Sequence, residues 1–437
     1  MTKLRPLPTT GARTGILEAL AFFRDPNFAK RRFDRLGNVF ETSMLGQSMV
    51  FIQGEKAISD LLSQSEAIEG WWPASVQQLL GSHSLANRNG PSHKARRRVV
   101  AQLFSSSALQ RYSPRIISLI DELADELKTA KAPLPLAEKM RRFAFSVIAT
   151  TVLGLEGNDR DKLFSDFEIW TKALFSIPIA LPGSPFAKAL KARKRLLKRL
   201  QAILSNPINS KGGLDLLAGS LDEAGIPLTD QDLGEQLLLL LFAGYETTAS
   251  ALSCLMRELL LKPQIETWLR EEIDILDWPP TPDQATMVYS PINAPKLDAL
   301  IKEVMRFNPP VGGFFRRTKK SIILDDIVVP NNRVVQVALI ASNRHGIVDL
   351  NIFRPQRHLE NECSLNLIPF GGGERLCLGK SLAELEIRLM VVGLFRKLKL
   401  EVIDRKFRGT NFIYTLRTKK GEHLPVFVHS HHIHQHE

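Results

Sequence analysis

A single cysteine set among glycines near the C-terminal end has the residue types of a metal-binding loop. The segment reads Phe370-Gly371-Gly372-Gly373-Glu374-Arg375-Leu376-Cys377-Leu378-Gly379. Successive glycines allow backbone conformations closed to other residues, so a flat ligand can lie against the main chain. Apolar residues at helical spacing follow from Leu378 to Leu398, and the amides at that helix N-terminus favour a thiolate. Cys377 is therefore a candidate axial ligand of haem iron, with a core cysteine beside a glycine-rich turn as the alternative.

A second candidate lies midway along the longest helical pattern, which runs from Thr229 to Lys262 and stops at Pro263. A helix of that length extends roughly 50 Å, enough to cross the whole protein. Its middle reads Ala243-Gly244-Tyr245-Glu246-Thr247-Thr248, and the glycine there costs about 1 kcal/mol relative to alanine. Small residues would leave room for dioxygen, and an acid followed by a hydroxyl can carry protons. The alternative is a helix with an incidental glycine.

Two further pairs of polar side chains stand at helical spacing. Pro91 opens a helix on which His93 and Arg97, four residues apart, share one face. Two donors on one face can bind a buried carboxylate, although such a basic face is more often solvated. Glu303 and Arg306 form an i, i+3 pair that by itself indicates only an ordinary helix surface.

Length and composition predict one soluble domain spanning residues 1–437. Apolar residues make up 44% of the chain without any linker of low complexity, and no run reaches the roughly 20 residues needed to cross a bilayer. Three cysteines are too few for a disulfide framework and indicate a reducing cytoplasm. A formal charge of +12 favours acidic partners; nucleic acid is the alternative, but no zinc, helix-turn-helix or aromatic-basic motif supports it.

The remaining patterns predict a mainly α chain with a small β-rich subdomain. A β-hairpin is expected from Val39–Met44 and Met49–Ile52. Further expected elements are an amphipathic segment over Ile16–Leu36, helices over Pro114–Lys128, Leu136–Leu153 and Leu297–Phe307, and strands over Ile322–Leu324, Ile327–Val329 and Arg333–Ile340.

Three stretches are candidates for a substrate pocket or its entrance. Trp71 and Trp72 either pack in the core or form a substrate lid. Leu174–Phe186 is apolar but holds three prolines, so it is a loop suited to a pocket roof. The basic helix Lys188–Arg199 is either a solvated face or a surface that attracts a substrate carboxylate.

The spacing of phenylalanine, glycine, arginine, cysteine and glycine from Phe370 to Gly379 resembles the haem-binding loop of the cytochrome P450 superfamily. The resemblance implies a P450 fold with haem b bound through Cys377 as the iron ligand. The segment from Ala243 to Thr248 is similar to the oxygen-binding segment of the family, which gives Glu246 and Thr247 a catalytic role. The other cofactor-binding residues that it implies are Phe370, Gly371, Arg375 and Gly379 in the loop, and His93, Arg97 and Arg316 at the propionates, with Arg317 instead of Arg316 if the register slips.

The resemblance also implies a structural role for the pair of Glu303 and Arg306. In the family this pair is closed by an arginine, here Arg357, and scaffolds the haem loop. The chain departs from the family pattern at His358, where an aromatic residue is common, and at Arg344-His345-Gly346, which replaces an Arg-Asp-Pro step. These departures blur the loop alignment but affect no residue assigned to chemistry.

Within the superfamily the chain most resembles soluble cyanobacterial members that hydroxylate retinoids, relatives of the animal retinoic acid hydroxylases. This implies a monomeric haem-thiolate monooxygenase that inserts one atom of O2 into a C–H bond of a hydrophobic retinoid or terpenoid, with electrons from a ferredoxin or flavodoxin. A fatty-acid hydroxylase is one alternative; a haem isomerase, peroxide-using enzyme or sensor is another, against which the Glu246-Thr247 pair speaks. The implied pocket residues are Trp72, Phe175, Ile177, Pro178, Phe242, Ala243, Val311, Gly313 and Phe314.

Overall fold

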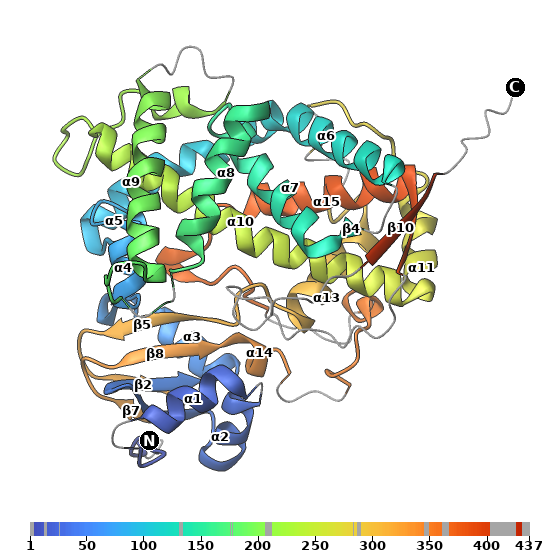
Figure 1. Cartoon of the computed structure of the whole chain (residues 1–437). Helices are drawn as coiled ribbons and strands as arrows, with labels where there is room; N and C mark the ends of the chain where they lie inside the picture. The colour runs from blue at the N-terminus through green and yellow to red at the C-terminus, as the bar shows by residue number, and fades with distance from the viewer. Residues whose placement is uncertain are drawn as a thin grey trace, which may run out of the picture.

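The computed structural model describes residues 4–12, 15–25, 27–130, 134–174, 176, 178–205, 212–282, 284–285, 290–344, 349–360, 367–402 and 425–430. Helices form most of the molecule, and a small sheet with two N-terminal helices lies along one side of them (Figure 1). The predicted mainly α fold with a small β-rich subdomain is therefore confirmed.

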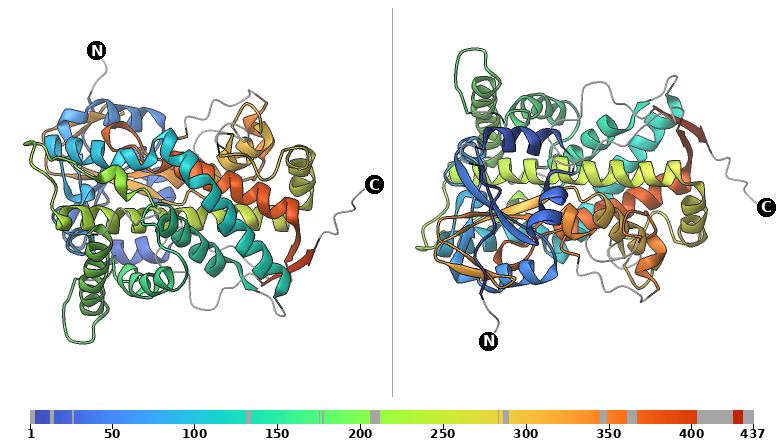
Figure 2. Two further views of the ribbon diagram at one scale, coloured as in Figure 1. Left: turned by 90° about the horizontal axis from the view of Figure 1, so that it is seen from above. Right: turned by 90° about the horizontal axis from the view of Figure 1, so that it is seen from below.

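The helical body is built around α10, Asp230–Leu261, which runs through its length (Figure 2). The Thr229 hydroxyl caps the helix by accepting a hydrogen bond from the amide of Asp232 at 3.1 Å, and Pro263 begins the next helix. The predicted central helix is thus confirmed at both ends. Around it lie α4 Ala74–Leu80, α5 Gly90–Ala101, α6 Ser106–Thr129, α7 Leu136–Thr151, α8 Gly157–Thr171, α9 Pro185–Leu204, α11 Pro263–Ile273, α13 Pro295–Phe307 and α15 Lys380–Lys397. Two more helices, α3 Glu55–Ser63 and α14 Leu339–Ser342, pack with the sheet (Figure 1).

By length and composition, α10 could also span a membrane. However, 67% of its most apolar window is buried inside the protein, as in the core helix of a globular fold.

The main sheet has the strand order β1-β2-β8-β5-β3, in which β2 and β8 are parallel. One face of the sheet packs on α1, Ile16–Arg24, and α2, Phe28–Leu36, through a cluster of phenylalanines that includes Phe40 and Phe51, stacked at 5.3 Å between ring centroids. The other face packs on α3. The strands of this sheet are β1 Val39–Met44, β2 Gln47–Ile52, β3 Ile68–Gly70, β5 Gly313–Thr318 and β8 Val334–Ala338; the others are β4 Leu134–Pro135, β6 Ile322–Leu324, β7 Ile327–Val329, β9 Leu398–Val402 and β10 Pro425–Ser430.

Several predicted boundaries are wrong, and two of them have a clear structural cause. The helix expected to start at Pro114 begins eight positions earlier, because Ser105 caps it and the buried Tyr112 and Ser113 hold its first turns, so that Pro114 is tolerated inside α6. The strand expected over Arg333–Ile340 stops at Ala338, where the chain turns into α14. In both places tertiary packing overrides the local pattern.

Candidate active site

The loop that carries Cys377 closes on itself just before α15. Gly371 and Gly373 have φ angles of 74° and 63°, a region that favours glycine. The amide of Cys377 donates to the carbonyl oxygen of Phe370 at 2.9 Å, and Gly379 is the N-cap residue of α15. The cysteine therefore lies directly ahead of a helix N-terminus, as predicted.

The thiol of Cys377 combines accessible surface with a buried environment. Burial raises its pKa above the usual value, and the amides of Gly379 and Lys380 and the charge of Arg97 oppose this shift only in part. The helix amides lower the pKa, as expected, but desolvation of the charge is the larger effect. Cys377 is exposed although many atoms surround its thiol, so it borders a recess. Coordination to a metal would deprotonate the thiol.

Four donor side chains gather beside this loop: His93 and Arg97 from α5, Arg316 from β5, and Arg375 from the loop. Burial, with the charges of Arg375 and Arg97, lowers the pKa of His93 to about 4. Burial and the charge of Arg375 lower the pKa of Arg316 to about 10. Because buried cations that face one another are costly without an anion between them, this basic cluster suits a ligand that carries carboxylates.

Sequence reasoning missed the residues that hold Arg375. One of them is Arg88, whose carbonyl accepts a bond from the Arg375 guanidinium. The guanidinium also donates to Asn89 Oδ1 at 2.5 Å, and the same oxygen accepts from the amide of Gly70 at 2.8 Å. A Cβ atom at position 70 would lie 2.2 Å from the guanidinium carbon of Arg375. Nothing in the local sequence marks Asn89, because its partner is 286 positions away.

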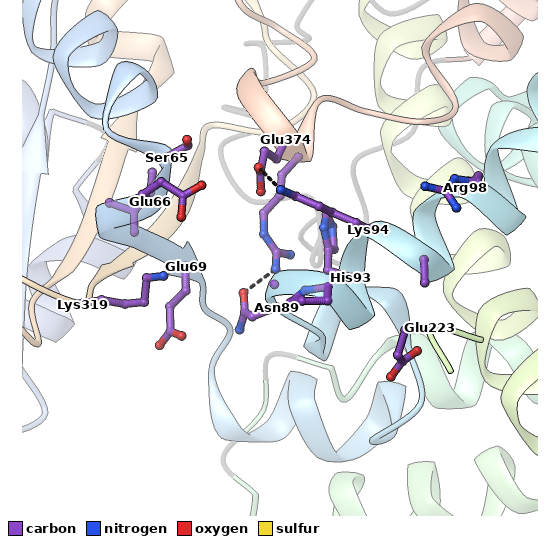
Figure 3. Close-up of a pocket in the computed structure, with 15 residues that line it drawn as sticks. Ser65, Glu66, Glu69, Asn89, His93, Lys94, Arg98, Glu223, Lys319 and Glu374 are labelled. Carbon is purple, nitrogen blue, oxygen red and sulfur yellow. Dashed lines mark hydrogen bonds and ion pairs between the residues drawn. The ribbon is translucent and has the colours of Figure 1, made fainter. Parts of the chain in front are cut away.

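A surface cleft of about 520 Å³ opens beside the basic cluster (Figure 3). His93 and Arg375 line it, and so do Lys94 and Glu374, which form an ion pair at 3.0 Å. The cluster is therefore connected to solvent on this side.

Arg316 and its neighbour Arg317 have different surroundings. Arg316 is 8% exposed and donates to the carbonyl of Phe315 at 2.7 Å. The side chain of Arg317 is 37% exposed and lies 3.8 Å from a carboxylate oxygen of Glu69. A bound anion stabilises a buried cation more than it stabilises a cation that already lies beside a carboxylate. Arg316 is therefore the better candidate for binding a propionate.

Ala243 and Gly244, the small residues in the middle of α10, have different surroundings. Ala243 is exposed although it lies midway along the most central helix, so it also borders a recess. Gly244 instead faces α7, where a Cβ atom would come within 2.9 Å of the Ile148 side chain. The expectation that both small residues leave open space is therefore wrong for Gly244, which allows close helix packing.

Glu246 and Thr247 follow on the same helix. The Thr247 hydroxyl donates to the carbonyl of Ala243 at 2.6 Å, as expected for a threonine that bends its helix. Glu246 lies 3.4 Å from the guanidinium of Arg141. Burial raises the pKa of Glu246, and Arg141 opposes this shift, so the carboxyl holds a proton more readily than an exposed glutamate does.

The other predicted pocket residues lie on four segments of the chain, which include Trp72, Pro178, Phe242 and Phe314. Trp72 is partly buried against the main core, and Phe242 lies 6.1 Å from Trp170 between ring centroids. The half-buried Phe314 packs under the guanidinium of Arg316, 4.7 Å from its ring centroid. Strand β5 therefore carries a predicted pocket residue and a predicted propionate-binding residue. Of the rest, Pro178 and Val311 are exposed, Gly313 and Ala338 are paired across β5 and β8, and Phe175 and Ile177 lie outside the described residues.

Glu303 and Arg306 are not a surface pair, since both side chains are fully buried in α13. Two bonds of 2.8 Å join them, and Arg357 Nε donates to the same carboxylate at 3.2 Å. Arg306 also donates to the carbonyl of Leu350 at 2.8 Å. The three predicted scaffold residues are therefore brought together.

His358 completes this network, although its identity was noted only as a departure from a pattern. Its Nε2 lies 2.8 Å from Glu303 Oε2, and the amide of Arg354 donates to Oε1 at the same distance. Burial alone would raise the pKa of Glu303, but the bonds from Arg306 and His358 lower it to about 2. The carboxylate is therefore charged over the whole physiological range.

A thiol that can ligate iron, beside a cluster that can bind carboxylates, is the arrangement expected of a haem-thiolate protein. Residues 16–423 match the family model "Cytochrome P450", and the chain belongs to this family. It is a monooxygenase that uses haem, as predicted.

Similar proteins come from animals and from a cyanobacterium. The chain is 33% identical to cytochrome P450 26B1 of Danio rerio over 88% of this chain and 79% of that one. It is 30% identical to putative cytochrome P450 120 of Synechocystis, over 98% of both chains. A solved structure, retinoic acid bound cyanobacterial CYP120A1, matches 98% of this chain and all of its own with a TM-score of 0.87 and 29% identity.

The described residues fit the haem group of this family. The positive φ angles of Gly371 and Gly373 shape a loop open to a flat ring, and the Cys377 thiol has accessible surface beside it. The basic cluster offers donors to the two propionates, which would relieve the repulsion between Arg316 and Arg375.

Replacing Arg316 by alanine should weaken haem retention more than replacing Arg317. Only Arg316 is buried without a carboxylate beside it, so a propionate would depend on it. We expect the rate of haem transfer to apomyoglobin to rise about tenfold or more in Arg316→Ala, since bonds to charged groups contribute roughly 1.5–3 kcal/mol. Equal rates in the Arg316→Ala and Arg317→Ala variants would contradict the assignment.

Proposed function

We propose that the chain hydroxylates a retinoid, inserting one atom of O2 into a C–H bond of a long hydrophobic carboxylic acid. The observation that carries the substrate class is the likeness to a retinoic acid bound structure over nearly the whole chain, at a TM-score of 0.87. The resemblance of the sequence to the animal retinoic acid hydroxylases favours the same class. A terpenoid or a fatty acid of similar length is the nearest alternative.

In this proposal the cofactor is haem b, held by Cys377 and by His93, Arg97, Arg316 and Arg375 at its propionates. Phe370, Gly371 and Gly379 would shape the loop against the ring. When bound, the haem supplies the activation of dioxygen and the oxidation of the C–H bond. The protein residues hold it, exclude water from one face and deliver protons.

Glu246 and Thr247 are the residues that we assign to proton delivery. The raised pKa of Glu246 lets its carboxyl hold a proton at neutral pH more often than an exposed glutamate. Glu246 contacts Arg141, whose side chain is 23% exposed. This contact connects the carboxyl of Glu246 to solvent, from which protons can come. The Thr247 hydroxyl, one residue on, can accept a proton and pass it toward the recess beside Ala243.

The pocket would be lined by apolar side chains, among them Trp72, Phe242 and Phe314. Burial of apolar surface contributes about 25 cal/mol per Å², so a substrate of retinoid length gains many kcal/mol before ordering costs are subtracted. On α9, Arg193 pairs with Glu235, and Arg195 and Arg199 pair with Asp166. This favours a solvated or structural role for the basic helix over capture of a substrate carboxylate.

We further propose a soluble, cytoplasmic monomer that receives electrons from a ferredoxin or flavodoxin. The formal charge of +12 favours an acidic donor. Peripheral contact with a membrane would give a hydrophobic substrate a route of entry.

Retinoic acid should bind at micromolar concentration and shift the haem spin state. A long apolar pocket buries most of its chain, whereas camphor-sized molecules bury far less. The measurement is an optical titration of the ferric protein with all-trans-retinoic acid, palmitic acid and camphor. A response to camphor alone would contradict the retinoid proposal, and a response to palmitic acid alone would favour the fatty-acid alternative.

Thr247→Ala should uncouple electron consumption from product formation. The variant loses the hydroxyl that passes protons but keeps the helix, so haem content and substrate binding stay as in the wild type. We expect the fraction of electrons recovered in product to fall about tenfold or more and peroxide to rise, whereas Thr247→Ser restores most coupling. Wild-type coupling in Thr247→Ala would refute the role of the hydroxyl.

A further inference from the structure

Asn89 precedes α5 as its N-cap residue, but its side chain does not cap the helix. Its backbone is extended, with φ of -134° and ψ of 163°, and asparagine is among the residues that cap helices best. The side chain nevertheless makes no capping bond to α5. The backbone carbonyl of Asn89 accepts from the amide of His93 at 3.4 Å, so the residue still holds the first turn of the helix. The side-chain amide is therefore available for contacts with other elements.

The side chain of Asn89 binds the edge strand of the main sheet. Its Oδ1 accepts from the amide of Gly70 at 2.8 Å, and its Nδ2 donates to the carbonyl of Gly70 at 3.4 Å. Gly70 ends β3, the last strand of the sheet, and lies opposite Arg316 of β5 in the antiparallel register. Asn89 thus connects the start of α5 to the pair of strands that carries Arg316.

The same oxygen of Asn89 holds Arg375 of the cysteine loop. Arg375 Nη2 donates to Asn89 Oδ1 at 2.5 Å and to the carbonyl of Arg88, so both of its hydrogens are used. Among the described residues, none accepts a bond from Nε or Nη1 of Arg375, and these nitrogens remain to donate to an anion. Asn89 lines the surface cleft together with His93 (Figure 3). One side chain therefore joins three of the elements that carry the basic cluster.

Two carboxylates in this cleft are alternative partners for Arg375. Burial lowers the pKa of Arg375, and the charges of Glu374 and Glu69 act in the opposite direction. Among the described contacts, Glu374 pairs with Lys94 at 3.0 Å and Glu69 lies 3.8 Å from Arg317. If Arg375 were not held by Asn89, these carboxylates would compete with a propionate for its guanidinium.

We propose that Asn89 is a positioning residue for haem, which sets the spacing of His93, Arg316 and Arg375 and thereby determines how tightly haem is held and at what potential its iron is reduced. This inference rests on the proposed function, in which Arg375 binds a propionate. A donor that neutralises a propionate makes reduction easier, because less negative charge then opposes the added electron. A neutral amide holds Arg375 without adding a charge that competes with the propionate.

The test compares Asn89→Ala and Gly70→Ala with a matched control, Asn87→Ala. Asn89 is exposed, so its replacement by alanine removes the bond to Arg375 and leaves the core intact. Gly70→Ala displaces the same guanidinium from the other side, because a Cβ atom there would lie 2.2 Å from its central carbon. Asn87 also donates to two backbone carbonyls, but these lie at α4 and its C-terminal end and not in the cysteine loop.

Haem transfer and the reduction potential are the two measurements. The rate of haem transfer to apomyoglobin should rise about three- to tenfold in Asn89→Ala and in Gly70→Ala, since each weakens a bond to a charged group. The reduction potential of the holoprotein should become more negative in both variants. Asn87→Ala should keep the wild-type rate and potential, and equal effects in this control would overturn the proposal.

A double replacement decides whether Asn89 acts through Arg375. In the Arg375→Ala background, Asn89→Ala should change the transfer rate by less than about twofold, because the contact is already lost. If Arg375→Ala leaves transfer and potential as in the wild type, the assignment of Arg375 to a propionate fails, and this inference fails with it. If Arg375→Ala changes both but Asn89→Ala and Gly70→Ala do not, or if the effects of Asn89→Ala and Arg375→Ala add in full, the role of Asn89 alone is refuted.

Discussion

Replacing Cys377 by serine is expected to abolish monooxygenase activity and to remove the red-shifted ferrous carbonyl band that thiolate ligation gives. Cys377 is the described thiol that lies on the glycine-rich loop at the N-terminus of α15 and has accessible surface. A serine hydroxyl is a weaker and less readily ionised ligand, so haem is held loosely or through another group. The measurement is the carbon monoxide difference spectrum together with product formation.

The second described thiol, Cys254, provides the control for this change. It is fully buried in α10, and burial raises its pKa to about 12, so it stays a neutral core side chain. Cys254→Ser should lose some stability but keep the carbonyl band of the wild type. An unchanged band in Cys377→Ser, or a lost band in folded Cys254→Ser only, would overturn the assignment of the iron ligand.

Glu303→Gln is expected to destabilise the protein by about 3–5 kcal/mol, because it leaves Arg306 and Arg357 buried without their counter-charge. Loss of the network should also loosen the chain around Leu350 and Arg354, whose backbone groups it binds. The thermal midpoint and the haem content of the purified protein measure both effects. The matched control is Asp34→Asn, which removes an exposed ion pair with Lys30 and should cost under about 1 kcal/mol.

The pH dependence of this difference follows from the lowered pKa of Glu303. A carboxyl with a folded pKa of about 2, against 4.5 for an ordinary glutamate, stabilises the fold at pH values above the ordinary pKa. The contribution, about 3 kcal/mol, is lost as the pH falls from about 4.5 toward 2. The gap in stability between wild type and Glu303→Gln should therefore be constant above pH 5 and narrow below it; a gap that widens on acidification would contradict the network.

The elements with strong local signals were predictable from the sequence. α10 has a capping threonine, an unbroken apolar pattern and a terminating proline, so both ends were predicted to within a residue. The hairpin β1–β2 has apolar residues at Val39, Phe40 and Met49–Ile52, on either side of a turn in which Leu45 and Gly46 have positive φ angles. Caps, turns and prolines determine where such elements begin and end, and the tertiary contacts agree with these local signals.

The candidate site was predictable only where its residues belong to a spaced motif. Cys377 and Arg375 stand in one loop, but the hydrogen bonds that hold Arg375 come from Arg88 and Asn89, in a segment without periodic pattern. His358 shows the same limit, because a histidine in a loop acquires its role only when α13 brings Glu303 to it. Gly244 was singled out correctly, yet its reason is the Ile148 side chain of another helix.

The pKa of Cys377 shows that a local rule gives only one of several contributions. The helix amides do lower it, as the sequence predicted, but burial raises it more. Burial depends on the whole fold and leaves no local mark in the sequence.

Oxygen incorporation tests the central claim most directly. The protein would be incubated with a ferredoxin or flavodoxin donor system, all-trans-retinoic acid and ¹⁸O2, and the products analysed by mass spectrometry. The account predicts a hydroxylated retinoid that carries one ¹⁸O atom from the labelled gas, formed by the wild type and absent with Cys377→Ser. A product without ¹⁸O, or oxidation of fatty acids while retinoic acid is left unchanged, would contradict it.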